Sequence, residues 1–224
     1  MSPAPPLVRP EQLLFDGSLS PLTTHLLFLE CPAQVAAEGF ITWRAETGQT
    51  CNSARLAAPL ERALGHLPPV RFDARRHLFV PTTGRWTAYF NNYPLGANVD
   101  SIAPPLARVL GVRAAQVSAG PLPDGEEDLL QFRTFEPEEE TGPSTGRSVG
   151  LRNTRGWWRF WRTGTPLPFE DLAAYRSRRL KRRFTFEHLV AYSGALGLRP
   201  FDATFYIPEQ GAWLVTCGPR SRPL

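Results

Sequence analysis

The chain has 224 residues, of which 42% are hydrophobic and 21% are charged, and its formal net charge is +4. This composition is typical of a folded protein and excludes a disordered chain. No apolar run approaches the roughly 20 residues that a transmembrane helix needs, so we expect no membrane partner. The N-terminus lacks a basic region followed by an apolar core, the pattern of a secretory signal, which favours a cytoplasmic location.

The cysteines and histidines indicate neither a disulfide framework nor a metal site. Cys31, Cys51 and Cys217 are widely spaced and odd in number, as in proteins from a reducing compartment. We expect Cys217 to be a small buried apolar residue. No cysteine pair or histidine pair has the spacing of metal ligands. The sequence therefore predicts no metal and no cofactor.

In the first part of the chain, the Pro-rich residues 1–22 are expected to be loosely ordered. Thr24–Glu30 is an apolar run that predicts a buried strand. Residues 32–43 are ambiguous between one helix and a helix followed by a strand. Ser53–Pro69 predicts a helix because leucines recur every four residues, and Pro59 either kinks this helix or delays its start.

Residues 70–93 predict two strands joined by a turn at Thr83 and Gly84. In the second strand, Trp86, Ala88 and Phe90 alternate with Arg85, Thr87 and Tyr89, so they should share one face. A helix is expected from Asp100 to Leu110, with its two prolines in the first turn and Gly111 after its end. Residues 113–120 predict the next strand.

Residues 129–135 predict a strand inside an acidic, turn-rich stretch, and residues 156–161 predict an aromatic strand. A helix is expected to begin near Phe169 and to run toward Arg183. Thr185 can cap a further helix that ends at Gly197. Two strands at residues 201–207 and 212–217 finish the chain.

These elements predict an α+β fold in which antiparallel sheets are covered on one side by helices. We divide the chain into a lead-in (1–22), an N-terminal half (23–120), an acidic connection (121–147) and a C-terminal half (148–224). Both halves show an aromatic strand, a helix ending in Leu-Gly-apolar-Arg, and a strand, so they can be similar units. The alternative is that Gly is simply the usual helix stop.

A basic cluster fills residues 176–183, where six of the eight residues are Arg or Lys. On a helix, Arg176, Arg179 and Arg183 would share one face, and Arg178 and Arg182 another. Such Arg forks can bind phosphates or a carboxylate-rich protein. Alternatively, this is a solvated helix face that the acidic residues 138–140 partly neutralise.

A second cluster contains Trp157, Trp158 and Trp161. On a strand, Trp157 and Trp161 would face one way together with Arg159, while Trp158 would face the other way. Core packing explains these aromatics, and so does a partner-binding anchor, because Trp and Arg dominate interface hot spots.

Signatures of catalysis are absent. The chain has no phosphate-binding loop and no G-x-S-x-G elbow. The carboxylates Glu170 and Asp171 are explained by capping of predicted elements. We therefore expect no catalytic residues, and an enzyme of unrecognised type is the third interpretation of the chain.

The C-terminal half carries a pattern of aromatic, Pro, Gly and Arg positions: Trp158, Phe160, Gly164, Pro166, Pro168, Phe169, Glu170, Tyr175, Arg178, Arg179, Arg183, Phe184, Thr185, Leu189, Tyr192, Leu196, Gly197, Phe201, Phe205 and Tyr206. With "GRWTAYFNN" and the turn from Gly96 to Asp100, the pattern resembles a family of largely uncharacterised bacterial proteins. In size, expected compartment and lack of an active site, such proteins resemble the immunity partners of secreted bacterial toxins.

This resemblance implies a non-catalytic cytosolic protein that neutralises a toxin by direct binding. The expected partner-binding residues are those of the two clusters: Arg176, Arg178, Arg179, Arg182, Arg183, Trp157, Trp158 and Trp161. The alternative partner is a nucleic acid or another anionic ligand bound by the basic residues, although no nucleic-acid-binding motif is present.

Overall fold

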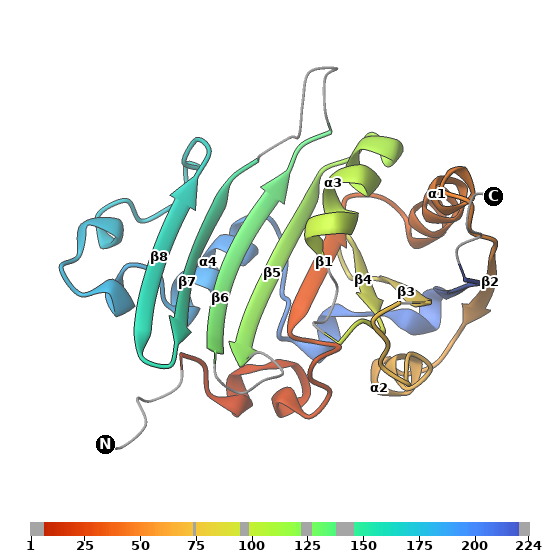
Figure 1. Cartoon of the computed structure of the whole chain (residues 1–224), viewed down its shortest axis with the longest axis horizontal. Helices are drawn as coiled ribbons and strands as arrows, with labels where there is room; N and C mark the ends of the chain where they lie inside the picture. Colours follow the sequence, from red (N-terminus) through yellow and green to blue (C-terminus); the bar gives the residue numbers. More distant parts are fainter. Residues whose placement is uncertain (1–6, 74, 95–98, 122–126, 138–145, 220–224) are drawn as a thin grey trace.

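The computed structural model describes residues 7–73, 75–94, 99–121, 127–137 and 146–219. Its strands form one nine-stranded antiparallel sheet (Figure 1). In chain order the strands are β1 (His25–Leu29), β2 (Cys51–Leu56), β3 (Arg76–Pro81), β4 (Thr87–Asn91), β5 (Ala114–Pro121), β6 (Glu127–Phe135), β7 (Ser148–Thr154), β8 (Trp157–Thr163) and β9 (Ala212–Cys217).

The described α-helices are α1 (Ala33–Glu46), α2 (Leu60–Leu64), α3 (Val99–Leu110) and α4 (Phe186–Ala195). Short 3₁₀ turns complete the fold: η1 (Pro10–Gln12), η2 (Leu14–Gly17), η3 (Ala174–Arg176), η4 (Leu180–Arg182), η5 (Ala203–Phe205) and η6 (Pro208–Gln210). None of the helices in the described ranges is long and apolar enough to cross a membrane. The prediction of a mixed fold with an antiparallel sheet is thus confirmed.

The strand order is β2-β9-β3-β4-β1-β5-β6-β7-β8. Strands β5 to β8 are neighbours in both sequence and space, so they form a meander that ends at β8. The strand β6 lies within the predicted acidic connection and pairs with β5 and β7 on its two sides, which makes the sheet continuous across β6.

Two apolar cores lie on opposite faces of the sheet. Along β1, Leu26 and Phe28 enter the larger core with α2, α4 and the N-terminal turns, whereas Leu27 and Leu29 enter the smaller core with α1 and α3. Figure 1 shows α3 in front of the sheet and α4 behind it. The expectation that helices cover one side was therefore wrong. The central strands β4 and β5 are buried along nearly their whole length, which requires cover on both faces.

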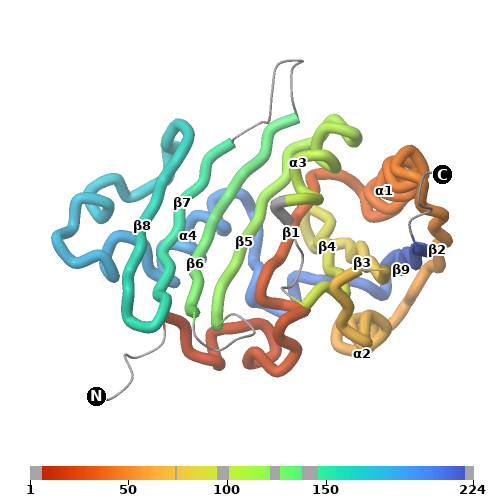
Figure 2. The backbone as a smooth tube through the Cα atoms, in the orientation of Figure 1, coloured from red at the N-terminus to blue at the C-terminus, as the bar shows by residue number. Residues whose placement is uncertain are grey.

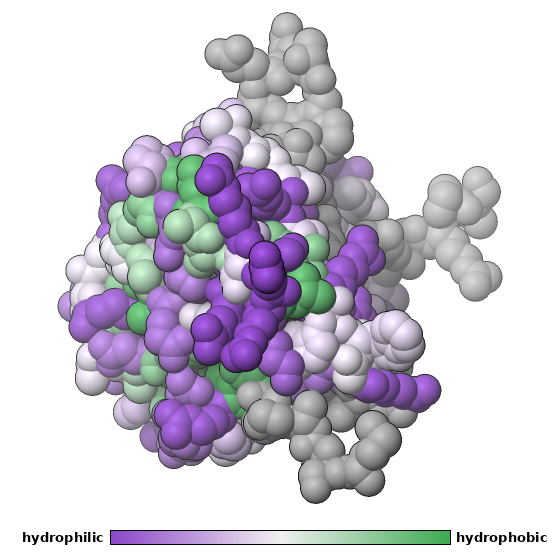
Figure 3. Space-filling model, turned by 90° about the vertical axis from the view of Figure 1, so that its left-hand side faces the viewer, coloured by the Kyte–Doolittle hydropathy of each residue, from purple (hydrophilic) through white to green (hydrophobic). Residues whose placement is uncertain are grey.

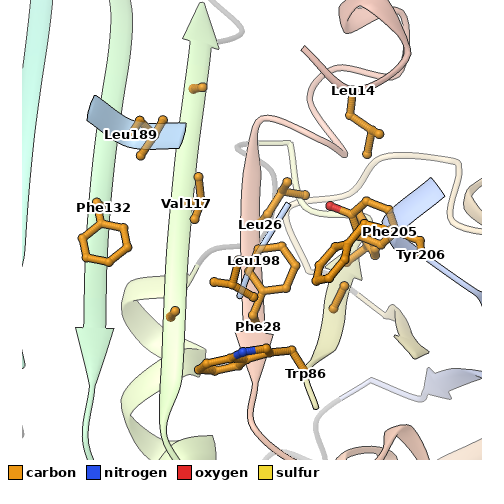
Figure 4. Close-up of a cluster of buried hydrophobic side chains, with 14 of the residues drawn as sticks. Leu14, Leu26, Phe28, Trp86, Val117, Phe132, Leu189, Leu198, Phe205 and Tyr206 are labelled. Carbon is orange, nitrogen blue, oxygen red and sulfur yellow. The ribbon is translucent and has the colours of Figure 1, made fainter. Parts of the chain in front are cut away.

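The larger core gathers side chains from segments that are distant in the sequence (Figure 4). Phe28 of β1 lies beside Leu198, which follows α4, and beside Phe205 and Tyr206 near the C-terminus. Leu14 from the Pro-rich N-terminal segment is also buried. The described part of that segment therefore packs on the sheet, and its short turns place Val8, Leu14 and Leu22 in the core.

Several predicted elements were assigned correctly. The alternation in β4 places Trp86, Ala88 and Phe90 in the larger core, as expected. Helix α3 is followed by Gly111 and helix α4 by Gly197, both with positive φ. Thr185 caps α4 and accepts a hydrogen bond from the backbone N–H of His188 at 3.4 Å.

Other segments differ from the prediction. Within Ser53–Pro69, Pro59 delays the helix to Leu60, and the residues before it form strand β2, because they pair with β9. In residues 201–207 the predicted strand is replaced by the 3₁₀ turn η5, whose N-cap Asp202 accepts a hydrogen bond on its side chain from the Thr204 backbone, and Tyr206 forms only an isolated β-bridge with Thr82. The second copy of the predicted repeat thus lacks its final strand.

The cysteine prediction was also wrong. Cys51 and Cys217 lie directly opposite each other in the β2–β9 ladder, with 4.0 Å between their Cα atoms, and they form a disulfide. Among the three cysteines, Cys31 is free and buried. Sequence spacing did not reveal the pair because the two residues are 166 positions apart and meet only when the sheet forms.

Candidate partner-binding surface

The β7–β8 hairpin forms one end of the sheet. Its turn consists of Arg155 and Gly156, with φ values of 50° and 92°. Positive φ at both central residues is typical of the two-residue type I′ hairpin turn. The Asn153 side chain accepts a hydrogen bond from the Gly156 backbone at 2.9 Å. The sequence predicted β8 but not β7, although a Gly after a polar residue between two apolar segments is a hairpin signal.

The three tryptophans of β8 have three different environments. Trp157 is 81% exposed, next to the hairpin turn. Trp158 is half-buried against the larger core, and the Lys181 ammonium lies 4.4 Å from its ring centroid. The Trp161 indole packs over Gly150 of the facing strand, where a Cβ atom on residue 150 would lie 2.1 Å from the ring. The Nε1 of Trp161 donates a hydrogen bond to the Ser148 hydroxyl at 3.3 Å. Of these tryptophans, Trp157 presents the most accessible aromatic surface.

Residues 164–183 leave the end of β8 and fold back beside it before they lead into α4 (Figure 2). A buried ion pair holds this segment on the sheet. The Arg147 guanidinium donates two parallel hydrogen bonds to Glu170, from Nε to Oε1 at 2.8 Å and from Nη2 to Oε2 at 2.7 Å. The two side chains are 2% and 0% exposed. Arg147 also donates to the carbonyl oxygen of Gly164 at 2.8 Å.

Two tyrosines complete this network. The Tyr175 hydroxyl donates to Glu170 Oε2 at 2.7 Å and lies 3.0 Å from the Tyr192 hydroxyl. Burial raises the pKa of Tyr175, so the phenol keeps its proton. Glu170 Oε1 accepts a further bond from the Leu167 backbone at 2.9 Å. Glu170 is thus the acceptor at the centre of a buried network, and the prediction that it caps a helix was wrong.

The basic residues do not lie on a helix. Residues 169–183 contain only the single turns η3 and η4, and Ser177 and Arg179 between them have extended backbone angles. The expected helix faces were therefore wrong. The cluster nevertheless lies beside β8, since Lys181 covers Trp158 and the Arg183 guanidinium is 5.7 Å from the Phe160 ring centroid. The local sequence pattern predicted a helix wrongly here, because Glu170 and Tyr175 form hydrogen bonds with distant residues and these bonds hold the backbone of residues 169–183 in a non-helical path.

Most of the cluster is open to solvent. Arg176, Arg178, Arg179, Lys181 and Arg182 are exposed, and Arg183 is half-buried, with its Nε donating to the Ser177 carbonyl at 2.8 Å. Figure 3 views the molecule from the side of β8, and hydrophilic residues cover much of that face, with hydrophobic patches between them.

These cations have no acidic partner within the described ranges. There, no carboxylate forms an ion pair with a basic residue of the 176–183 cluster, nor with Arg159 and Arg162 of β8. The predicted neutralising residues 138–140 lie outside the described residues. The surface formed by β8 and residues 176–183, named the β8 basic surface below, therefore carries a high local positive charge.

A pocket of about 500 Å³ opens in the β8 basic surface, lined by Trp158, Arg179, Leu180, Lys181 and Arg182. The indole ring and the aliphatic stems of the basic side chains form its walls, so its interior is apolar while its rim is charged. This combination suits a partner that presents an apolar side chain among acidic ones.

A polar network on the other face of the sheet resembles a catalytic pair. His25 Nδ1 lies 2.8 Å from the Ser118 hydroxyl, which also accepts a bond from Gln116 at 3.1 Å. Burial lowers the pKa of His25 to about 4, and Ser118 is fully buried. A hydroxyl without solvent access cannot reach a substrate, so this network stabilises the sheet. Within the described residues, no three His, Cys, Asp or Glu side chains are placed to hold a metal ion.

No family model matches this chain, and neither a curated protein nor a solved structure matches it.

Proposed function

We propose that this protein is a non-catalytic binding protein whose β8 basic surface docks on an acidic region of a partner protein. The partner proposed is a toxin domain that the complex keeps inactive, as immunity-type proteins do. The observation that carries the proposal is the cluster of exposed cations, without carboxylate partners among the described residues, on a segment held by the buried Arg147–Glu170 pair. A preorganised charged surface loses less conformational entropy on binding than a mobile one.

An acidic protein suits this surface better than a nucleic acid. Binding of single-stranded nucleic acid relies on aromatic rings on which bases stack. In β8, Lys181 lies over the Trp158 ring, which also lines the pocket, and Trp161 lies against Gly150. Of the three rings, Trp157 is therefore the one that is largely exposed, whereas stacking of successive bases needs several. An apolar pocket with a basic rim, by contrast, matches the mixed surface of a protein. A nucleic acid bound by the same cations is the competing outcome of the experiment below.

The cytosol is part of the proposal. The spacing of the cysteines no longer supports a reducing compartment, because Cys51 and Cys217 form a disulfide. An immunity-type role implies the cytosol, and free thiols trapped by alkylation during lysis of the native host test it. Three free thiols per chain would support a reducing compartment, whereas one, with the Cys51–Cys217 disulfide formed, would contradict the cytosol.

The experiment is affinity capture from the native host with the tagged full chain, with and without nuclease. The Arg179→Glu/Arg182→Glu variant removes the charge at the pocket rim. The matched control is Arg62→Glu, an exposed charge reversal in α2. We expect one stoichiometric, nuclease-resistant protein whose affinity falls by about tenfold or more in the double variant and by less than about twofold in the control. Rising ionic strength should weaken the interaction.

Three results would contradict the proposal. Recovery that nuclease abolishes would assign the cations to nucleic acid. Equal capture by the double variant would leave the cluster as a solvated surface. A captured protein that does not inhibit growth when expressed alone would exclude the immunity role, while the binding role would stand.

A further inference from the structure

We infer that the partner adds an extended acidic segment, as one more strand of the sheet, to the edge of β8 that no described strand pairs with. This inference rests on the proposed function, and it specifies how the partner is held. Strand addition at an exposed sheet edge supplies affinity through main-chain hydrogen bonds and specificity through alternate side chains.

The edge has unused backbone groups at alternate residues. In a hairpin with a two-residue turn, the pair that flanks the turn is hydrogen-bonded, here Thr154 and Trp157. The bonded and non-bonded pairs then alternate, so the N–H and C=O groups of Trp158, Phe160 and Arg162 point away from β7. No backbone hydrogen bond within the described ranges uses these outward groups.

The positive charge on this edge favours an acidic strand over a second copy of β8. Basic side chains on an edge strand oppose pairing between two copies of the same strand. Arg159 and Arg162 are both exposed on β8, so a second copy of this chain would place like charges side by side. An acidic strand would instead meet Arg162 on one face of the sheet and Arg159 on the other, with Arg179 and Arg182 nearby.

The pocket at Trp158 defines one further feature of the segment. Because side chains alternate along a strand, the residue that lies beside Trp158 would point toward the pocket of about 500 Å³. The pocket walls are apolar, so an apolar side chain is expected at that position, with acidic residues around it. The chemistry of the partner segment is thus an extended run of Asp or Glu interrupted by one large apolar residue.

The test is backbone amide exchange in the ¹⁵N-labelled full chain, measured by NMR. The probe is a short acetylated peptide of glutamates with a central leucine. We expect bound peptide to slow exchange about tenfold or more at the outward amides of Trp158, Phe160 and Arg162. The amides of Arg159 and Trp161 already bond to β7 and should change by less than about twofold, which makes them an internal control.

Two control ligands separate strand addition from simple charge attraction. The same peptide with alternate N-methylated residues keeps its charge and loses its hydrogen-bonding edge, so it should bind at least about tenfold more weakly. An oligothymidine of similar charge tests general affinity for polyanions. Equal binding of the oligothymidine, or no binding of the glutamate peptide, would overturn the inference.

Failure of this inference can be told apart from failure of the proposed function. If the peptide binds with unchanged amide exchange, or if its N-methylated form binds equally well, strand addition is wrong and the basic surface still stands. If Arg179→Glu/Arg182→Glu leaves both peptide affinity and partner capture unchanged, the proposed function itself is wrong.

Discussion

At the scale of single residues, the buried pair of Arg147 and Glu170 decides where the basic cluster lies. Glu170 accepts bonds from Arg147, Tyr175 and the Leu167 backbone, and these link the start of β7 to the segment after β8. Glu170 and Tyr175 both belong to this buried network. Their roles here are structural, since they position the cations that face solvent.

Glu170→Gln should destabilise the protein by about 3–5 kcal/mol, because it leaves the buried Arg147 guanidinium without a counter-charge. Urea unfolding measures the change. The control Glu209→Gln removes an exposed carboxylate and should change the free energy of unfolding by less than about 0.5 kcal/mol. Equal stability of the two variants would show that the buried pair does not hold the segment.

His25 should make stability depend on pH. Burial lowers its pKa from 6.5 to about 4, so the folded state binds the proton less readily than the unfolded state. The contribution is fully present above about pH 6.5 and is lost as the pH falls toward about 4. At 1.36 kcal/mol per pH unit, the loss reaches about 3 kcal/mol.

The measurement compares urea unfolding of the native chain and His25→Gln from about pH 7 to about pH 4, with the stability difference between them as the readout. Carboxylates such as Glu30, whose pKa is lowered by its hydrogen bond to Arg113, titrate in both proteins and cancel in this difference. A difference that does not vary with pH would mean that His25 is protonated in the folded protein.

At the scale of elements, the two edge strands of the sheet differ in how they are held and in what they expose. The edge strand β2 is attached to β9 by the Cys51–Cys217 disulfide, whereas the edge strand β8 carries exposed arginines. The disulfide holds a strand whose side chains are mostly exposed and contribute little to the core. Covalent attachment compensates for the small apolar area that β2 buries.

The disulfide predicts a thiol count. Denatured, unreduced protein should react with thiol reagent at one site, Cys31, and reduced protein at three. Reduction should lower the free energy of unfolding by roughly 2–4 kcal/mol, because it releases a loop of 166 residues. In Cys31→Ser, the unreduced protein should show no reactive thiol. Three reactive thiols without reduction would contradict the bond.

At the scale of the whole molecule, the sheet is continuous from β2 to β8. Strand β1, near the N-terminus, lies between β4 and β5. Strand β9, near the C-terminus, pairs with β2 and β3. Elements from both ends of the chain also share the larger core. We infer that residues 23–120 and 148–224 stabilise each other.

One cooperative unfolding transition is therefore expected. Tryptophan fluorescence and far-ultraviolet circular dichroism should give coincident urea transitions, and Glu170→Gln should lower both midpoints together. Two separate transitions, with only one of them moved by Glu170→Gln, would instead support the division into two halves.

Elements whose cause is local could be predicted from the amino-acid sequence alone. Alternation identified β4, Thr185 identified the start of α4, and glycines after α3 and α4 identified their ends, because these signals act between residues close in the chain. The sequence also identified the two clusters of the candidate surface, since clusters of Arg and Trp are visible without a fold.

Tertiary structure decided what depends on distant partners. The disulfide forms only because β2 and β9 pair in the sheet. Helices cover both faces of the sheet, as the burial of β4 and β5 requires. The path of residues 169–183 depends on the bond between Glu170 and Arg147, which are 23 positions apart. Separating the buried Arg147–Glu170 pair would leave uncompensated buried charges and cost about 3–5 kcal/mol, whereas helix propensities differ by only a few tenths of a kcal/mol per residue. That pair is why the basic residues lie beside the edge of β8 and not along a helix.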